Sequence, residues 1–299
     1  MTKNGKCLWI VETLLQAGAL SLRELNERWE RSALYDGHRI QERTFSRYKE
    51  HIAEEYAIDI DYSPSTNTYD IVNREEIRDN ALYRYLFAAY HVADLNTQTL
   101  RHRDRVMMEP VPTGAEHLAT ILDAIDRKRT VRFNYTSYYS PELQDWELVP
   151  AFLRVFEGRW YLIAEYMNRQ RVKTFALERI SRLQIGETQA EPSPELLPGE
   201  YYAGCYGIIR EEEKRPRLIR LWADRQQRCY LRAQPLHESQ EEIETEEDHS
   251  IFTYFLRPSF DFYQRILWMR EKVELLGPEE VRREMTDLVR RLAEKYYAE

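Results

Sequence analysis

Residues 158–180 hold the densest group of side chains that could bind an anionic or aromatic ligand. Read as a strand, the first part alternates between Trp160, Leu162 and Ala164 on one face and Arg159, Tyr161 and Ile163 on the other. The returning part places Arg171, Lys173, Phe175, Leu177 and Arg179 on one side. A sheet face that joins Arg, Lys, Tyr and Phe predicts a surface for a phosphate-bearing or aromatic ligand. The alternative is a half-solvated hairpin whose arginines only keep the protein soluble.

Neighbouring segments add polar and aromatic residues to this surface. Each of them, taken singly, is an ordinary surface residue, but grooves that follow a nucleic-acid backbone combine Arg or Lys with stacking aromatic rings. Their concentration in one small β domain therefore favours ligand binding, and Asn134 belongs to the same polar lining. The candidate ligand-binding residues are Arg132, Tyr135, Ser137, Arg154, Arg159, Tyr161, Lys173 and Arg179.

A second candidate surface lies on a helix that we expect from about Gln41 to Tyr56. Its buried face would hold Phe45, Tyr48 and Ile52, which leaves a face of basic and hydroxyl side chains opposite. Arg, Ser and Thr at the start of a recognition helix suit contacts to guanine and phosphate. The candidate DNA-binding residues are Arg39, Arg43, Thr44, Ser46, Arg47, Lys49 and His51. Four glutamates on the same helix dilute the positive field, so a solvated face of a protein-interaction domain is the alternative.

The chain lacks the motifs of an enzyme. Its seven histidines are scattered without an HExxH or similar metal-binding pair, and its ten glycines form no phosphate-binding loop. Cys205 has no histidine close to it in the sequence, which favours a buried or linker thiol over a nucleophile. We therefore expect no catalysis, no bound metal and no cofactor.

Composition is that of a globular protein of two or three domains. A chain of 299 residues is longer than a single hydrophobic core usually accommodates. No apolar run approaches the ~20 residues that span a bilayer. The start, Met1 to Lys6, does not read as a signal peptide, and the three cysteines are isolated, so we expect a cytoplasmic protein with reduced thiols. The net charge of −8 argues against a nonspecific nucleic-acid coat but leaves room for a local basic face. We expect the acidic run from Glu238 to Asp248 to be a solvated loop or turn.

The order of the expected elements predicts a multidomain α+β fold and divides the chain into five parts. We expect three helices, over 7–18, from Leu22 after a Ser21–Glu24 capping box, and over 41–56. Two strands follow, over 58–62 and 69–72. This is the order of a winged helix-turn-helix at 1–73. A helical linker at 74–114 should bury Ile77, Leu82, Leu86 and Tyr90 as a stripe. A helix and five strands over 115–189 predict a small curved sheet or barrel. After a linker at 190–213, the βαββαβ-like order over 214–299 indicates a ferredoxin-like α/β domain.

The motifs of the middle part resemble those of WYL-domain transcriptional regulators, a family named after the tripeptide seen here as Trp160-Tyr161-Leu162. The match includes Phe133 to Ser137, Pro150 to Phe156, and Gly158 to Leu162. It closes with Phe175 to Ile180, which is similar to the family's Phe-x-Leu-Asp-Arg-Ile, although Glu178 replaces the aspartate. In the N-terminal part the resemblance depends mainly on Arg43-Thr44-Phe45.

The resemblance implies an Sm-like five-stranded WYL barrel that senses a nucleic acid or nucleotide, followed by a C-terminal extension called WCX. It also implies a homodimer whose paired winged helices bind an inverted-repeat operator in double-stranded DNA. Tyr135, Ser137, Arg154, Arg159, Tyr161 and Arg179 match the family's polar pocket positions, whereas Arg132 and Lys173 come only from the strand alternation.

Three functional hypotheses follow. The first is a ligand-responsive, DNA-binding transcriptional regulator, specifically a repressor. The second is a nucleic-acid-binding interaction module that is not a sequence-specific transcription factor, with the winged helix pairing with protein. The third, an enzyme acting on nucleotides, is disfavoured because no metal or acid–base cluster is present. The sequence gives neither the operator nor the effector, nor the sign of regulation, nor the domain that makes the main dimer contact.

Overall fold

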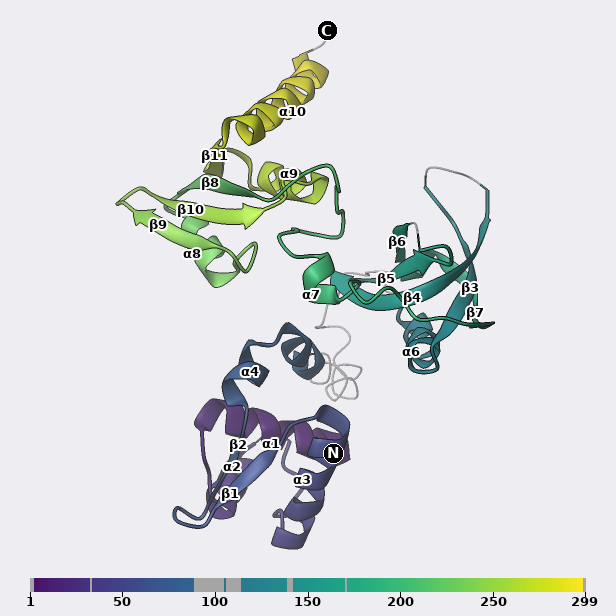
Figure 1. Cartoon of the computed structure of the whole chain (residues 1–299). Helices are drawn as coiled ribbons and strands as arrows, with labels where there is room; N and C mark the ends of the chain where they lie inside the picture. The colour runs from purple at the N-terminus through teal and green to yellow at the C-terminus, as the bar shows by residue number, and fades with distance from the viewer. Residues whose placement is uncertain are drawn as a thin grey trace. The chain divides into compact units, whose positions relative to one another are not determined.

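The computed structural model of the chain describes residues 3–32, 34–88, 105, 114–138, 142–169 and 171–297 (Figure 1). Its contacts divide the chain into two compact units, Met1–Glu109 and Pro110–Glu299. The fold is mixed α+β, and every sheet in the described residues is antiparallel. The finer domain boundaries expected from the sequence stay predictions.

Three helices and a hairpin form the first unit. The helices are α1 (Lys3–Ala17), α2 (Leu22–Arg31) and α3 (Glu42–Tyr56), and the hairpin pairs β1 (Ile60–Ser63) with β2 (Thr68–Ile71). The predicted capping box is present, since the Ser21 hydroxyl accepts the Glu24 N–H while the Glu24 carboxylate accepts the Ser21 N–H. The Ser21 hydroxyl also donates to this carboxylate, and together with the Ser21 N–H it lowers the pKa of Glu24. Because both partners are satisfied locally, α2 begins at a fixed residue.

Two pairs of hydrogen bonds hold the elements of this unit together. The Asn26 amide donates to the carbonyl of Ile40 and accepts its N–H, at 2.9 and 2.7 Å, and both residues are buried. The segment before α3 is thereby held to α2. Leu20 and Tyr69 exchange backbone hydrogen bonds, which attaches the hairpin to the loop between α1 and α2. Phe45, Tyr48 and Ile52 are buried as predicted, so the opposite face of α3 is left to solvent.

The expected apolar stripe of the following helical segment is right for Ile77, which is buried, and wrong for the residues after it. After α4 (Arg74–Asp79), residues 81–88 are helical. Leu82 and Leu86 are exposed, and the side chains that pack on the core of the unit are Phe87 and Tyr83. Tyr83 also donates a hydrogen bond to the carbonyl of Tyr56. The stripe is therefore shifted by one residue, while Tyr90 lies outside the described residues.

Five antiparallel strands make the first sheet of the second unit, in the order β6-β5-β4-β3-β7. They are β3 (Arg129–Tyr135), β4 (Gln144–Phe156), β5 (Arg159–Tyr166), β6 (Val172–Ala176) and β7 (Ile180–Gln189). The short 3₁₀ helix η1 (Ala115–His117) and helix α6 (Leu118–Asp126) precede the strands, and α6 packs on β3, β4 and β7. A second 3₁₀ helix, η2 (Leu177–Arg179), joins β6 to β7. Gly114 is required where it stands, because its φ is 63° and a Cβ would lie 2.4 Å from the backbone of Leu177.

Phe175 is the centre of the core of this sheet. The rings of Phe133, Tyr135 and Trp146 meet it edge-on at 5.0–5.5 Å between centroids. Edge-to-face pairs of this kind stabilise by ~0.5–1.5 kcal/mol each beyond the area they bury. Two strands, β3 and β4, are thus held to one side chain of β6.

A four-stranded antiparallel sheet forms the C-terminal part, in the order β11-β8-β10-β9. Its elements are β8 (Arg217–Asp224), α8 (Gln227–Ala233), β9 (Glu241–Thr245), β10 (His249–Leu256), α9 (Phe260–Met269), η3 (Arg270–Lys272), β11 (Val273–Gly277) and α10 (Glu279–Tyr297), after the short α7 (Pro198–Tyr201). The interpretation of residues 238–248 as an acidic turn is wrong for β9. Exposed edge strands tolerate charge, and Arg232 of α8 binds Glu242 with two hydrogen bonds of 2.8 and 2.6 Å.

Among the helices that the structure describes, none is long and apolar enough to cross a membrane. A search of the same residues finds no group of three or more His, Cys, Asp or Glu side chains placed to hold a metal ion.

The three thiols should differ sharply in reactivity. Burial raises the pKa of Cys7 to about 11 and also raises that of Cys205, whereas Cys229 is exposed. Since the thiolate is the reactive form, raising the pKa leaves the buried thiols protonated at pH 8. We expect Ellman's reagent to label only Cys229 rapidly in the native protein at pH 8, and all three cysteines in denaturant. Rapid labelling of Cys7 in the folded chain would contradict the burial of α1.

Candidate nucleic-acid and ligand interface

Arg43 and Arg47 form the basic part of the exposed face of α3. They are four residues apart, so their side chains lie one turn from each other on the same face. Both are exposed, and within the described residues neither makes an ion pair. Two uncompensated guanidinium groups near the start of a helix are suited to phosphate oxygens and base edges.

The other residues predicted for this surface have local partners. Glu30 binds Arg39 with two hydrogen bonds of 2.6 and 2.8 Å, and this pair lowers the pKa of Glu30. Lys49 lies over the ring of Tyr69, 5.3 Å from its centre. His51 makes a hydrogen bond of 2.9 Å with Asn4. The structure therefore groups Arg43 with Arg47 and turns Lys49 and His51 toward neighbouring elements.

Two hydroxyl residues complete the predicted set. Ser46 is exposed and donates to the carbonyl of Glu42, whereas Thr44 is half-buried. Glu50 and Glu54 continue the face that begins with Arg43 and Arg47, at three- and four-residue spacing. The positive field is consequently confined to the N-terminal half of α3.

The strand register corrects the single cationic face expected from residues 158–180. Lys173 pairs with Ala164 and Phe175 with Leu162, so both lie on the face of β5 that packs into the core. Arg159 and Tyr161 are on the opposite face, together with Thr174. The alternation within each strand is as expected, but the two cationic sets are separated because the connecting turn fixes a register that sequence alternation leaves open.

Lys173 is accordingly an aromatic-bound cation and not a member of the Arg159 group. Its Nζ lies 4.2 Å from the ring centre of Trp146 and 5.4 Å from that of Phe175. Partial burial lowers its pKa. Contacts of this kind stabilise by ~0.5–2 kcal/mol according to how far the charge is desolvated.

The outer face of β4 and β5 brings three predicted residues together. Arg154 is the register partner of Tyr161. Arg159 lies on the same face of β5, two residues before Tyr161. Glu178 of η2 accepts from Arg159 over a long 3.4 Å contact and is itself largely buried. Burial raises the pKa of Tyr161, with Arg159 opposing and Glu178 reinforcing that shift. This face, which we call the Arg154–Arg159 face, therefore offers two guanidinium groups and a phenol.

A residue that the sequence did not indicate covers part of this face. The guanidinium of Arg154 stacks on Tyr202, 3.8 Å from its ring centre, and Tyr202 is 7% exposed. Tyr202 also meets Phe152 edge-on and shares a small core with Ile163 and Cys205. Burial lowers the pKa of Arg154. The segment after β7 is thus packed on the sheet through aromatic contacts.

Arg179 forms a separate group with two tyrosines. Its Cζ lies 4.7 Å from the ring centre of Tyr135 and 3.8 Å from that of Tyr138, and its Nε donates to the carbonyl of Thr136. Ser137 lies between these residues in the chain. Burial raises the pKa of Tyr135, against the lowering effect of Arg179. Tyr138 is 75% exposed and was not among the predicted residues, although its place beside Ser137 was a signal.

Arg132 does not join either group. It is exposed on β3, where its register partners are Glu147 and Gln184. The residues on each side of it, Val131 and Phe133, face the core. The inclusion of Arg132 depended only on strand alternation, and that alternation points it away from the core-facing aromatics.

Comparison with models of protein families shows which known domain the five-stranded sheet resembles. Residues 116–185 match the model of the WYL domain. The chain carries a WYL domain. The match begins within η1 and ends within β7, so it includes four whole strands, the first part of β7 and both groups of candidate ligand-binding residues.

Two solved structures resemble the chain at low sequence identity. One is Proteasome accessory factor B/C (PafBC) of Arthrobacter aurescens, at 18% identity and a TM-score of 0.35, covering 95% of this chain and 45% of that one. The other is described as the crystal structure of a CRISPR Cas-related protein, at 14% identity and a TM-score of 0.37, covering 98% and 84%. The chain therefore spans less than half the length of PafBC. No curated protein matches the sequence.

Replacing Tyr202 by alanine tests the packing over the WYL domain. Removing a buried aromatic side chain costs ~3–5 kcal/mol in comparable sites. We expect Tyr202→Ala to lower the free energy of unfolding by about 3 kcal/mol and to expose the segment 190–213 to limited proteolysis. Tyr230→Ala is the matched control, since Tyr230 is 61% exposed and should change stability by less than ~0.5 kcal/mol. Equal effects of the two substitutions would show that Tyr202 is not an anchor.

Proposed function

We propose that the chain is a ligand-responsive transcriptional regulator that binds double-stranded DNA through its N-terminal unit and a nucleic acid or nucleotide through its WYL domain. In this proposal residues 1–73 are a winged helix-turn-helix, and the WYL domain is an Sm-like barrel. The C-terminal sheet is a ferredoxin-like WCX extension. The protein is a cytoplasmic homodimer that acts as a repressor at an inverted-repeat operator, without catalytic activity.

The observation that carries the DNA-binding part is the exposed, unpaired Arg43–Arg47 face of α3. Phe45, Tyr48 and Ile52 anchor the helix from behind, and the Asn26–Ile40 tie fixes its start. A rigid helix whose first two turns present free guanidinium groups is the arrangement that recognition helices use in the major groove. The net charge of −8 disfavours nonspecific binding of DNA over the whole surface, so a local basic face must carry the contact.

The ligand-sensing part is supported by the WYL domain match and by the Arg154–Arg159 face. The long Arg159–Glu178 contact leaves Arg159 42% exposed, and exposed ion pairs contribute only ~0–1 kcal/mol. A phosphate group can therefore compete with Glu178 for this guanidinium. Tyr161 beside it supplies a ring on which a base can stack.

Substitutions on α3 test the DNA-binding part in both directions. Arg43→Ala with Arg47→Ala should abolish operator binding in a gel-shift assay and leave the oligomeric state unchanged, because both side chains are exposed. Glu50→Gln with Glu54→Gln, on the same face, should strengthen binding by removing repulsion of phosphate. Unchanged binding by the arginine variant would reject the assignment. Barrel-dependent binding to single strands without preference for duplex would favour the interaction-module hypothesis instead.

Replacing Arg159 by alanine tests the sensing part. The DNA-binding surface is on a different unit, so Arg159→Ala should keep operator affinity in the same gel-shift assay. It should remove the change in affinity caused by a short single-stranded oligonucleotide or a mononucleotide added as the effector probe. Arg132→Ala is the matched control, since Arg132 lies outside both groups of candidate residues. Joint loss of operator binding and effector response in Arg159→Ala would instead indicate a structural role.

A further inference from the structure

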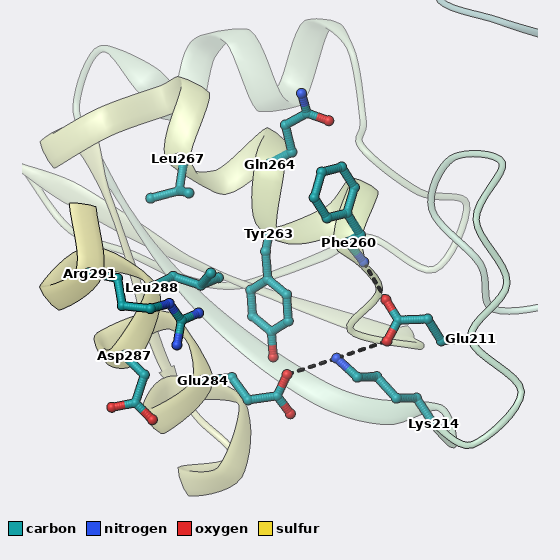
Figure 2. Close-up of a pocket in the computed structure, with 10 residues that line it drawn as sticks. All are labelled: Glu211, Lys214, Phe260, Tyr263, Gln264, Leu267, Glu284, Asp287, Leu288 and Arg291. Carbon is teal, nitrogen blue, oxygen red and sulfur yellow. Dashed lines mark hydrogen bonds and ion pairs between the residues drawn. The ribbon is translucent and has the colours of Figure 1, made fainter. Parts of the chain in front are cut away.

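A groove with an apolar floor lies between α9 and α10 in the C-terminal part of the chain (Figure 2). It encloses about 370 Å³, a volume within the range of small-molecule sites. Leu267 of α9 and Leu288 of α10 line it, together with the rings of Phe260 and Tyr263. Two leucines and two aromatic rings form a surface on which a flat apolar ring can pack.

The hydroxyl of Tyr263 is a buried polar group without a partner in this groove. Tyr263 is 4% exposed, and its hydroxyl makes no hydrogen bond with any residue that the structure describes. Burial raises the pKa of this phenol, and the nearby Glu284 carboxylate raises it further, so the hydroxyl is a donor at neutral pH. Because a buried donor without a partner costs free energy, an acceptor oxygen on a ligand would stabilise it.

The carboxylates at the rim of the groove already have cations. Lys214 forms ion pairs with Glu284 at 2.7 Å and with Glu211 at 3.2 Å. The same ammonium donates to a backbone carbonyl at 2.9 Å, so its three donors are used within the chain. Asp287 forms an ion pair with Arg290 at 3.1 Å. A cationic ligand would therefore have to displace a cation that the chain itself supplies.

Arg291, by contrast, is a cation of the rim that is still available. It lies on α10 three residues after Leu288, and it forms no ion pair or hydrogen bond with any described residue. Figure 2 shows its guanidinium turned toward the groove. The guanidinium of Arg291 and the hydroxyl of Tyr263 are both donors. Together they select an acceptor oxygen that carries negative charge.

A single negative charge fits this groove better than two. Glu211 and Glu284 also line the groove, and both would repel a phosphate group, which carries close to two charges at neutral pH. A carboxylate carries one charge, and its two oxygens match the paired N–H groups of a guanidinium. The apolar floor next to these donors calls for a ring attached to that carboxylate.

We propose that the groove between α9 and α10 binds a small aromatic carboxylate. Its ring packs on Leu267 and Leu288. Its carboxylate accepts hydrogen bonds from the Arg291 guanidinium and the Tyr263 hydroxyl. The groove lies outside the WYL match at residues 116–185, so this is a second ligand site, and it goes beyond the nucleic-acid or nucleotide ligand of the proposed function.

Phenylacetate is the probe for this site, and its binding to the full chain is measured by isothermal titration calorimetry. We expect a dissociation constant of about 1 mM, an ordinary affinity for a ligand of about ten non-hydrogen atoms. Phenylacetamide has the same ring without the charge, and phenyl phosphate has a second charge. Both should bind at least about tenfold more weakly. Absence of phenylacetate binding at about ten times the expected dissociation constant, or equal binding of the amide, would overturn the proposal.

Arg291→Gln tests the charge that the ligand meets. It should weaken phenylacetate binding by about tenfold or more, because it removes the available cation. Arg283→Gln is the matched control, since Arg283 is exposed on the same helix and is not among the residues that line the groove. It should stay within about twofold of the parent, because solvent and salt screen an exposed charge outside the site. Equal effects of the two substitutions would reject the role of Arg291.

Tyr263→Phe tests the hydroxyl with two measurements. It should weaken phenylacetate binding by about fivefold, the effect of losing one hydrogen bond. It should leave the thermal unfolding midpoint of the free protein unchanged or higher, because the hydroxyl that it removes has no partner in the fold. A lower midpoint would show that the hydroxyl is bonded within the chain and would overturn the site. None of these outcomes depends on operator binding in the gel-shift assay, which separates this inference from the proposed function.

Discussion

The pairing of β5 with both of its neighbours is the constraint on which the WYL domain depends. β5 lies between β4 and β6, and both of its faces are covered. On one face Leu162 and Ala164 pack into the aromatic core around Phe175, and on the other Ile163 packs under Tyr202. Since a slip of one residue would exchange the two faces, burial on both sides fixes the register strongly. That register positions Arg154, Arg159 and Lys173.

The same constraint separates Arg154 and Arg159 from Lys173. The face toward Tyr202 presents Arg154 and Arg159, while Lys173 is bound by aromatic rings at the core side. Arg179 belongs to neither strand face, because η2 interrupts the chain between β6 and β7 and turns it onto Tyr135 and Tyr138. A ligand that contacts the Arg154–Arg159 face therefore lies next to the segment that carries Tyr202.

The two ends of the chain use helices in contrasting ways. α3 is anchored by three buried side chains and two amide hydrogen bonds, which leaves its arginines free. α10 packs on the C-terminal core through Val281, Met285 and Leu288, and its last turns carry the exposed Leu292 and Tyr296. The exposed side of α3 is therefore basic near its start, whereas the exposed side of the last turns of α10 is partly apolar.

Local pattern determined much of the secondary structure. The Ser21 capping box, the buried face of α3 and the alternation within β5 depend on near neighbours in the chain, and they follow from residue spacing. The motif around Trp160-Tyr161-Leu162 likewise located the WYL domain before any fold was known. The sequence did not predict β9, because its carboxylates are typical of a turn until Arg232 and the edge of β10 are placed beside them.

Tertiary structure alone decided which residues share a surface. Lys173 and Arg159 follow the same alternation in sequence, yet the register of β5 and β6 puts them on opposite faces. Tyr202 gave no signal, since a linker tyrosine has no period, and only its packing on Phe152 and Arg154 reveals its place. The physical reason is the same in each case: spacing along a strand or helix fixes a side chain's direction within that element. Its neighbours are fixed only by how the elements pair and pack.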